Sequence, residues 1–545
     1  MEMSGPDGSV AAPAEDLEGV EASEALAIMT QMCLIIFVFI AGWLLERKHV
    51  TFVSEAAVGL LVGVAAGGAA FAFTHKFDAS AYGEWMNFSP DFFFFALLPP
   101  IIFDAGYSLD PKLFFGNFDA ICTLAFVGTF VSAIIITTLV FVMGLAGACY
   151  ELTFIQAGLF GSLISATDPV TTLAILGNVR ADQNLYYLIF GESVLNDAVA
   201  IVMYQTLNEF QHQKFSVGSL GKAFGVFLMI FVGSCLIGAG FGLLSSLFYR
   251  FAQFRQREHY DIVEACLLVP VPVAAYMAAE GAGLSGIVSI LFCGIVMARY
   301  TRQNLTKRTS ENSLAFFKIL ARTSETFVFI YMGLSLFLGH QTFDMWGMWV
   351  MFIIAFLGML AARVCNVLPG VALVNLRRSP ESKISRRHQI FLWFSGLRGA
   401  IAFALAMKST DDVGDEAGAV IFSVTLLIVL VTVLIFGGLT PLMLEKLDVL
   451  DKSSPYSPMA AGDSDDERPL GGKDHQSDSE TKRDISNVEM SDMLGTPKSY
   501  VTSVELRSDA GSSDTPLRKF IRTASGKLSV QEIDKGLHKV FVSPQ

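Results

Sequence analysis

The chain has 545 residues, of which 53% are apolar, 12% aromatic and only 16% charged. Soluble globular domains carry about 25% charged residues, so this composition excludes a soluble enzyme. The formal net charge of −13 argues against nucleic-acid binding, which needs a basic surface. The seven cysteines occur singly in or beside apolar runs, without the paired spacing of a zinc site, and we interpret them as packing residues. The sequence therefore predicts an all-α polytopic membrane protein.

Composition divides the chain into three parts. Residues 1–24 are acidic and contain no Lys or Arg, so they lack the basic start of a cleaved signal peptide. Residues 25–445 form the apolar transmembrane part. Residues 446–545 are rich in Ser, Asp, Gly, Lys and Pro, which predicts a mostly disordered tail. Within the tail, residues 517–541 are basic with scattered apolar positions, which indicates a short amphipathic helix on a membrane or a partner, or else a segment that contacts nothing.

The apolar part contains about thirteen runs long enough to cross a membrane. These runs cover residues 25–45, 52–74, 91–109, 119–147, 153–178, 184–206, 217–249, 260–279, 282–298, 312–338, 346–375, 389–407 and 416–444. Sixteen Lys and Arg residues lie in the loops on one side, against four on the other: Lys76, Lys214, Lys222 and Lys408. The positive-inside rule then predicts a luminal or extracellular N-terminus and a cytoplasmic C-terminal tail.

Two Asn-X-Ser/Thr sequons fall on opposite sides of this predicted topology. Asn304 lies on the basic, cytoplasmic side and is expected to stay unmodified. Asn87 lies in the loop of residues 75–90 on the other side, so it is the candidate for glycosylation.

Charged groups inside a bilayer are costly, which makes them candidates for function. Those well inside the runs are Asp168, Glu192, Asp197, Glu325, Arg363 and Arg398. Those nearer the ends, which we interpret as interfacial or structural, are Glu55, Asp104, Glu264, Glu280, Lys318 and Arg322. All eight histidines fall at boundaries, in loops or in the tail, so a proton carrier within the membrane would be a carboxylate.

The densest polar cluster is GESVLNDAVAIV, residues 191–202, in the sixth run. Helical spacing places Glu192 above Asn196 and Ser193 above Asp197 on adjoining faces. Oxygens of Asp197, Asn196 and Ser193 suit a small hard cation that keeps some of its water. The same carboxylate can take a proton, so cation and proton would compete for one group. The alternative is a polar network that joins helices.

Two runs contain helix-breaking sequences. In SATDPVTTLAI, residues 165–175, Pro169 removes a backbone donor and disfavours helix at Asp168, so Thr167 and Asp168 lie at a predicted break. The twelfth run has its own interruption, formed by Ser395, Gly396, Leu397, Arg398 and Gly399. Interrupted helices in corresponding places of two halves indicate a transporter binding site.

The positions of these breaks predict an internal repeat. If the seventh run is a linker, runs one to six and eight to thirteen form two inverted six-helix repeats, in which runs five and twelve correspond. This prediction is based on topology alone, because the two halves show no residue-level similarity. The sequence contains no HExxH, GxSxG or Walker motif, so it predicts no intramembrane enzyme and no cofactor.

Six motifs in order resemble those of the eukaryotic sodium/proton exchangers of the monovalent cation:proton antiporter superfamily. They are ALLPPIIFDAGYSL (96–109), GSLISATDPVTTLAI (161–175), FGESVLNDAVAIV (190–202), GLSGIVSILFCGIVMARY (283–300), SETFVFIYMGLSLF (324–337) and WFSGLRGAIAFALA (393–406). The residues of several motifs are more similar to those of the endosomal and Golgi branch than to those of the plasma-membrane members. The tail of about 100 residues also resembles that branch, because plasma-membrane members have longer tails.

The resemblance implies a homodimer. Runs one to three and eight to ten would form the dimerisation domain, and runs four to six and eleven to thirteen a moving core that crosses at the broken runs. By motif match, Asp197 would be the cation and proton carboxylate and Asn196 its neighbour, while Thr167 and Asp168 belong to the crossing.

The resemblance also implies roles for the other intramembrane charges. Glu192 would pair with Arg363, which makes physical sense because either charge alone would be unfavourable at this depth. Arg398 would lie at the helix crossing and offset the negative ends of helices. Glu325 matches an acidic family position that we interpret as structural.

The expected function is electroneutral exchange of Na⁺ and K⁺ for H⁺ by alternating access, in an endosomal or Golgi membrane where it would regulate pH. One alternative is an antiporter of the same fold that prefers K⁺. The other is a membrane scaffold or sensor without transport, which loss of Asp197 or Asn196 would have indicated. The expected partners are these ions, membrane lipid, a second copy of the chain and a cytoplasmic regulator of the tail.

Overall fold

The computed structural model describes a helical protein, and its described residues contain no strand. The described residues are 14–48, 53–77, 92–168, 170–178, 182–211, 217–253, 260–338, 343–447, 537–538 and 540–542. Met1–Met459 and Phe541–Gln545 form one compact unit, and Ala460–Val540 form a second.

The first half of the chain contains α1 (Ala14–Arg47), α2 (Glu55–Phe77), η1 (Phe93–Leu97), α5 (Leu98–Tyr107), α6 (Pro111–Gly116), α7 (Phe118–Cys122), η2 (Thr123–Val127), α8 (Gly128–Leu145), α9 (Phe154–Ser165), α10 (Val170–Asn178) and α11 (Gln183–Glu209). The elements η1 and η2 are π-helical turns that continue into the following α-helix.

The second half contains α12 (Val217–Ala252), α13 (Asp261–Leu268), α14 (Pro270–Gly281), α15 (Gly286–Val296), η4 (Met297–Thr301), η5 (Arg302–Asn304), α16 (Lys307–Leu338), α17 (Trp346–Arg377), η6 (Pro380–Ser382), α18 (Arg386–Phe394), α19 (Ala400–Val413), α20 (Asp415–Val431), η7 (Thr432–Phe436) and α21 (Gly437–Leu447). The elements η4 and η7 are π-helical turns, and η5 and η6 are short 3₁₀ turns.

Side-chain caps fix where several helices begin. Thr153 and Gln156 form a capping box at the start of α9, each side chain bonding the other residue's backbone N–H. Asp182 accepts a hydrogen bond from Asn184 N at 2.8 Å at the start of α11, and Ser385 accepts one from His388 N at 3.2 Å at the start of α18. These caps satisfy the amide groups that a helix start leaves without a partner.

The described part of the chain contains eight helical stretches long and apolar enough to cross a membrane, and two shorter apolar ones, Phe93–Tyr107 and Phe154–Ser165. Large apolar side chains on the outside, such as Leu236, Ile319 and Leu357, are well exposed, as expected for a surface in contact with lipid. The predicted class, an all-α polytopic membrane protein, is confirmed. The number of thirteen spans and the disordered tail remain predictions.

Both expected helix interruptions are present. The fifth run is divided into α9 and α10, with residues 166–168 outside regular helix, and Pro169 lies outside the described residues. The twelfth run is divided into α18 and α19 by residues 395–399.

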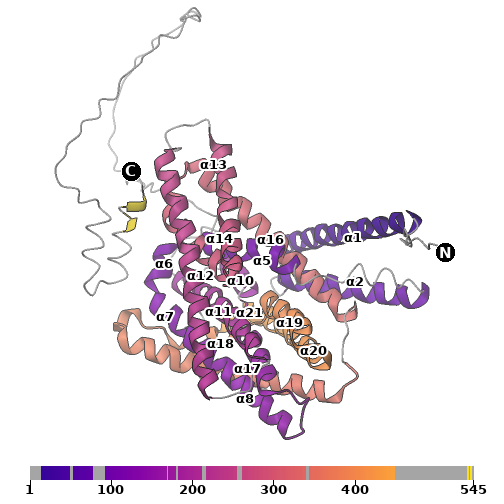
Figure 1. Cartoon of the computed structure of the whole chain (residues 1–545). Helices are drawn as coiled ribbons and strands as arrows, with labels where there is room; N and C mark the ends of the chain where they lie inside the picture. Colours follow the sequence, from indigo (N-terminus) through magenta and orange to yellow (C-terminus); the bar gives the residue numbers. More distant parts are fainter. Residues whose placement is uncertain are drawn as a thin grey trace, which may run out of the picture. The chain divides into compact units, whose positions relative to one another are not determined.

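Figure 1 shows the helices in chain order. By their contacts they pack in two groups. In one group α2 packs on α16, α5 on α15 and α16, and α12 on α14 and α15. In the other, α8 packs on α9 and α17, α9 on α11, and α19 on α20. The groups meet through α11 against α12 and α16 against α19, so both broken runs and the α11 carboxylates belong to the second group.

Glycines bring two helices of the first group into close contact. A Cβ added to Gly63 of α2 would lie 2.1 Å from Ile330 O, and one added to Gly333 of α16 would lie 2.3 Å from Leu60 O. Any side chain here would collide with the backbone of the opposite helix. Small residues therefore set the α2–α16 spacing, as in other membrane helix pairs.

Candidate functional site

The two helix breaks lie against each other. The backbone N–H of Asp168, in the break between α9 and α10, donates a hydrogen bond to Leu397 O, in the break between α18 and α19, at 2.9 Å. Non-helical backbone within a membrane persists only where its polar groups find partners inside the protein. The two breaks therefore form a single crossing.

Side chains of α11 satisfy the backbone of the first break. Asn196 Nδ2 donates to Thr167 Oγ1, and Thr167 N donates to Asn196 Oδ1 at 3.2 Å. Ser193 Oγ donates to the carbonyl oxygen of Thr167. All three side chains are buried, so the structure places Ser193 and Asn196 in a helix-joining polar network around Thr167.

Asp197 lies on the same helix but outside this network. Its side chain is partly exposed, and none of the described residues donates a hydrogen bond to its carboxylate. The nearby charges that act on it are Asp168, which repels it, and Arg398, which attracts it. A carboxylate in this setting has oxygens free to bind a cation or a proton.

Glu192 and Arg363 form a buried ion pair between α11 and α17. Both Nη atoms of Arg363 donate to Glu192, Nη1 to Oε1 and Nη2 to Oε2, the latter at 3.1 Å. The side chains are 1% and 5% exposed respectively. Arg363 Nη2 also donates to Leu392 O in α18 at 2.9 Å, so the pair connects three helices beside the crossing.

Arg398 bonds two carbonyl groups of the α18–α19 break, just after α18 ends. Its Nη1 donates to Gly396 O at 3.2 Å and to Leu397 O at 3.4 Å, and its side chain is fully buried. A guanidinium here offsets the partial negative charge of a helix C-terminus. Arg398 N donates to Thr432 Oγ1 at 3.2 Å. The sequence does not indicate this role of Thr432, because a threonine in an apolar run gives no signal of its own.

The glycines of the second break leave room for charged side chains. A Cβ on Gly399 would lie 1.6 Å from Asp168 Oδ2, and a Cβ on Gly396 would lie 2.8 Å from Arg363 Nε. The absence of a side chain at Gly399 therefore leaves space for the Asp168 carboxylate within the crossing. The absence of one at Gly396 leaves space for the Arg363 side chain.

The remaining predicted residues lie elsewhere. Glu325 is on α16 in the first group, with the charges of Asp168, Asp104 and Glu55 acting on it. Glu55 itself forms an ion pair with Arg322 between α2 and α16. Asn87 and Pro169 are outside the described residues.

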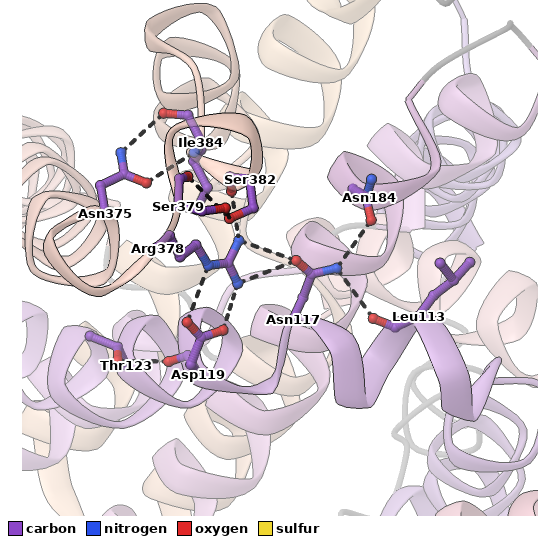
Figure 2. Close-up of polar contacts among 10 residues, drawn as sticks. All are labelled: Leu113, Asn117, Asp119, Thr123, Asn184, Asn375, Arg378, Ser379, Ser382 and Ile384. Atoms are coloured by element: carbon purple, nitrogen blue, oxygen red, sulfur yellow. Dashed lines mark hydrogen bonds and ion pairs between the residues drawn. The ribbon is translucent and has the colours of Figure 1, made fainter. Parts of the chain in front are cut away.

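A second polar network, which sequence analysis missed, joins helix ends of the second group (Figure 2). Arg378, just after α17, donates from Nε to Asp119 Oδ2 at 3.1 Å and from both Nη atoms to Asn117 Oδ1 at 3.3 Å. Asn117 Nδ2 in turn donates to Leu113 O at 3.2 Å and to Asn184 Oδ1 of α11 at 3.4 Å. In the sequence, Arg378 was counted only as one of the basic loop residues.

A family model for the transmembrane sodium/hydrogen exchangers matches residues 17–446. Sodium/hydrogen exchanger 5 of Arabidopsis thaliana is 43% identical over 425 residues, covering 78% of this chain and 80% of the relative. The endosomal/prevacuolar sodium/hydrogen exchanger of Saccharomyces cerevisiae is 32% identical, covering 82% of this chain and 72% of the relative. Sodium/hydrogen exchanger 9 of Rattus norvegicus is 39% identical, covering 70% and 60%.

The fold is similar to a solved antiporter structure. The sodium proton antiporter MjNhaP1 from Methanocaldococcus jannaschii aligns with a TM-score of 0.57 at 17% identity, covering 78% of this chain and 99% of that one. This likeness shows the fold, and the family match and the relatives show the lineage. The chain belongs to the sodium/hydrogen exchanger family, whose members are integral membrane secondary transporters and not enzymes.

Proposed function

We propose that this chain is an electroneutral antiporter that exchanges Na⁺ and K⁺ for H⁺ at a single site centred on Asp197. The observation that carries the proposal is the contrast on α11. Ser193 and Asn196 bond the backbone of the crossing, whereas Asp197 is partly exposed beside it and has no hydrogen bond from a described residue. Binding one cation or one proton there, but not both, gives exchange.

The charges around the crossing support a one-for-one exchange. With Glu325 of α16 left out of the count, ionised Asp197, Asp168 and Glu192 carry three negative charges, and Arg363 and Arg398 carry two positive ones. The remaining charge of −1 is neutralised by one Na⁺, one K⁺ or one H⁺. Asp168, next to Gly399 in the crossing, then stays in one protonation state and helps to attract the cation.

The oxygens next to Asp197 complete the proposed site. The side-chain oxygens of Thr167, Ser193 and Asn196 each keep a lone pair that accepts none of these hydrogen bonds. They can therefore contribute to binding a cation that keeps some of its water. Selection between Na⁺ and K⁺ then depends on how far apart these oxygens and the Asp197 carboxylate lie. An antiporter that prefers K⁺ is the second form of the same proposal.

We further propose a homodimer in an endosomal or Golgi membrane. The packing of the helices in two groups supports alternating access, with the second group moving as the core and the first as the dimerisation domain. A relative named for the endosomal and prevacuolar compartment supports the organellar location. The excess of Lys and Arg on one side of the predicted topology supports a luminal N-terminus and a cytoplasmic tail.

The test is cation-dependent pH change in proteoliposomes that contain the purified chain and an enclosed pH dye. An outward H⁺ gradient should dissipate on addition of Na⁺, and addition of K⁺ in competition ranks the two ions. Vesicles that contain the protein and show no cation-dependent change above protein-free vesicles would refute antiport and favour the scaffold or sensor.

A further inference from the structure

The last described residues of the chain, Phe541 and Val542, are buried against the helices. Each is only 7% exposed, although no described helix leads to them from α21. The rings of Phe541 and Tyr300 lie 6.0 Å apart between centroids, at 56°. Phe541 and Val542 belong to the same compact unit as the helices, so an apolar pair from the chain's end has a defined place there.

The backbone carbonyl of Phe541 accepts two buried hydrogen bonds. Asn304 Nδ2 donates to it at 2.8 Å, and Ser246 Oγ donates to it at 2.8 Å. Both donor side chains are almost completely buried. A buried donor that loses its acceptor is unfavourable, so the carbonyl of Phe541 satisfies donors that the helices bring together.

The donors are held in place without Phe541. Asn304, in η5, also donates to Ser246 O and Oγ of α12 at 3.1 Å. One turn earlier, Thr301 Oγ1 donates to Gly242 O at 3.3 Å. Hydrogen bonds that do not involve Phe541 therefore join α12 to η4 and η5. They hold the two donors, Asn304 Nδ2 and Ser246 Oγ, side by side.

A third helix, α13, also bonds α12 and Thr306, which lies just after η5. Glu264 of α13 accepts hydrogen bonds from Thr306 N at 3.0 Å and from Thr306 Oγ1 at 2.8 Å, while Tyr249 OH of α12 donates to Glu264 O at 2.9 Å. Hydrogen bonds with α13 therefore hold Thr306 in place, and Tyr249 joins α12 to α13.

The predicted topology agrees with a contact of this kind. The segment of Arg299, Arg302 and Arg308 lies on the basic side that the positive-inside rule makes cytoplasmic, which is also the side of the tail. Asn304 belongs to a sequon, yet its amide nitrogen bonds both Ser246 and Phe541. A glycan on that nitrogen would displace both, in agreement with an unmodified, cytoplasmic Asn304.

We propose that the ends of α12 and η5 form an intramolecular peptide-binding site whose ligand is the chain's own C-terminal Phe541–Val542 segment. Ser246 and Asn304 recognise the Phe541 carbonyl, and Tyr300 contacts its ring. The bound segment fastens the distal end of the tail to α12, the helix that links the two predicted repeats. This proposal does not depend on which cation is transported.

The experiment uses the full chain with a specific protease site inserted between Gly471 and Gly472 and an epitope tag at the C-terminus. The protein is purified in detergent, cleaved and separated by gel filtration, and the tagged fragment that remains with the transporter is measured. We expect the fragment to stay bound to the unmodified protein. Asn304→Ala should reduce the retained fragment by about tenfold, the change expected from loss of a buried hydrogen bond.

Two further variants make the result specific. Asn312→Ala removes the same side chain from an exposed position of α16 and should retain the fragment. Phe541→Asp alters only the ligand and leaves every transporter helix unchanged, so release of this fragment cannot arise from misfolding. Release of the unmodified fragment, or equal retention of the unmodified, Asn304→Ala and Phe541→Asp forms, would overturn the proposal. Transfer of the unmodified fragment to added lipid vesicles would favour a membrane-surface segment instead.

Discussion

Asp197 differs from its polar neighbours on α11 because its carboxylate remains outside their hydrogen bonds. Asn196 uses both ends of its amide on Thr167, and Ser193 uses its hydroxyl on the same residue. A group that is tied to the backbone can orient the site, but it cannot exchange its partner in every transport cycle. We therefore propose that Asp197 exchanges the ion and that its neighbours position it.

Asp197→Asn should abolish exchange and leave folding intact, because it removes a titratable charge with almost no change in volume and breaks no hydrogen bond from a described residue. The measurement is Na⁺-driven H⁺ movement in proteoliposomes, with thermal stability in detergent as the check on folding. Asp344→Asn, at an exposed position before α17, is the matched control and should transport normally. Persistent exchange by Asp197→Asn would exclude this carboxylate as the carrier.

Glu192→Gln and Arg363→Gln should each lower stability, by about 3–5 kcal/mol for a fully buried pair, because each leaves an uncompensated charge. The bidentate geometry and nearly complete burial of both side chains support this range. The double variant should recover part of the loss, since neither charge then remains. Thermal unfolding of all four forms gives the coupling energy, and strictly additive losses would argue against the pair.

At the scale of elements, the crossing joins two breaks that have different causes. The sequence predicts the α9–α10 break from a proline, and Thr167 in this break is bonded by α11. The α18–α19 break follows from two glycines and is closed by Arg398 on its own carbonyl groups. A direct bond, Asp168 N to Leu397 O, connects them. Each break thus supplies partners for groups that a membrane would otherwise leave unsatisfied.

Gly399→Ala should disrupt the crossing, because its new Cβ would lie 1.6 Å from Asp168 Oδ2. Overpacking of this kind costs about 1–3 kcal/mol, and displacement of Asp168 should also reduce exchange. Stability and transport are compared with those of Gly177→Ala in α10, where an added Cβ meets no atom within 4 Å. If both variants behaved alike, the space at Gly399 would not matter to the crossing.

Arg378→Ala should loosen the ends of α7, α11 and α17, since it removes the bonds to Asp119 and Asn117 shown in Figure 2. Asp119 is 51% exposed, so solvent reduces the effect, and we expect a loss of about 1–2 kcal/mol. Arg377→Ala, an exposed neighbour of the same charge, should cost little. The difference in melting temperature between the two variants measures how much the network contributes to stability. Equal melting temperatures would show that the bonds of Arg378 contribute nothing measurable.

At the scale of the whole molecule, the proposed single-site mechanism gives the core the same charge in both directions. A core with Na⁺ on Asp197 and a core with H⁺ on Asp197 have equal net charge, so the membrane field does no net work on one complete exchange. An uncompensated charge would feel about 2.3 kcal/mol per 100 mV, which would change the rate visibly.

Exchange should therefore be insensitive to membrane voltage. The measurement is the exchange rate in proteoliposomes under imposed K⁺/valinomycin potentials, after a separate test shows whether K⁺ competes as a substrate. If K⁺ competes, a diffusion potential of a permeant anion such as thiocyanate replaces it. A steep voltage dependence, or a reversal point at two protons per cation, would refute electroneutral exchange and add Asp168 to the carrier residues.

The amino-acid sequence by itself determined the membrane class and the two helix breaks. These features act through local physics. Apolar runs favour burial in lipid, a proline restricts φ and removes a backbone donor, and the glycines at 396 and 399 widen the range of allowed backbone dihedral angles. The family motifs likewise singled out Asp197 and Glu192, and the family resemblance implied Arg363 as the partner of Glu192. The count of thirteen spans stays a prediction, because broken or charged spans have no uniform hydropathy.

Only the tertiary structure decided which groups are partners. Asn196 meets Thr167 across 29 residues, Arg378 meets Asp119 across 259, and Phe541 meets Asn304 across 237. No local pattern specifies such pairs, because their geometry depends on how whole helices pack. The same packing separates Asp197 from the hydrogen-bonded network of its neighbours. The sequence shows three polar residues, Ser193, Asn196 and Asp197, within one and a half helical turns. The contacts between helices determine which of these side chains stays outside the hydrogen bonds.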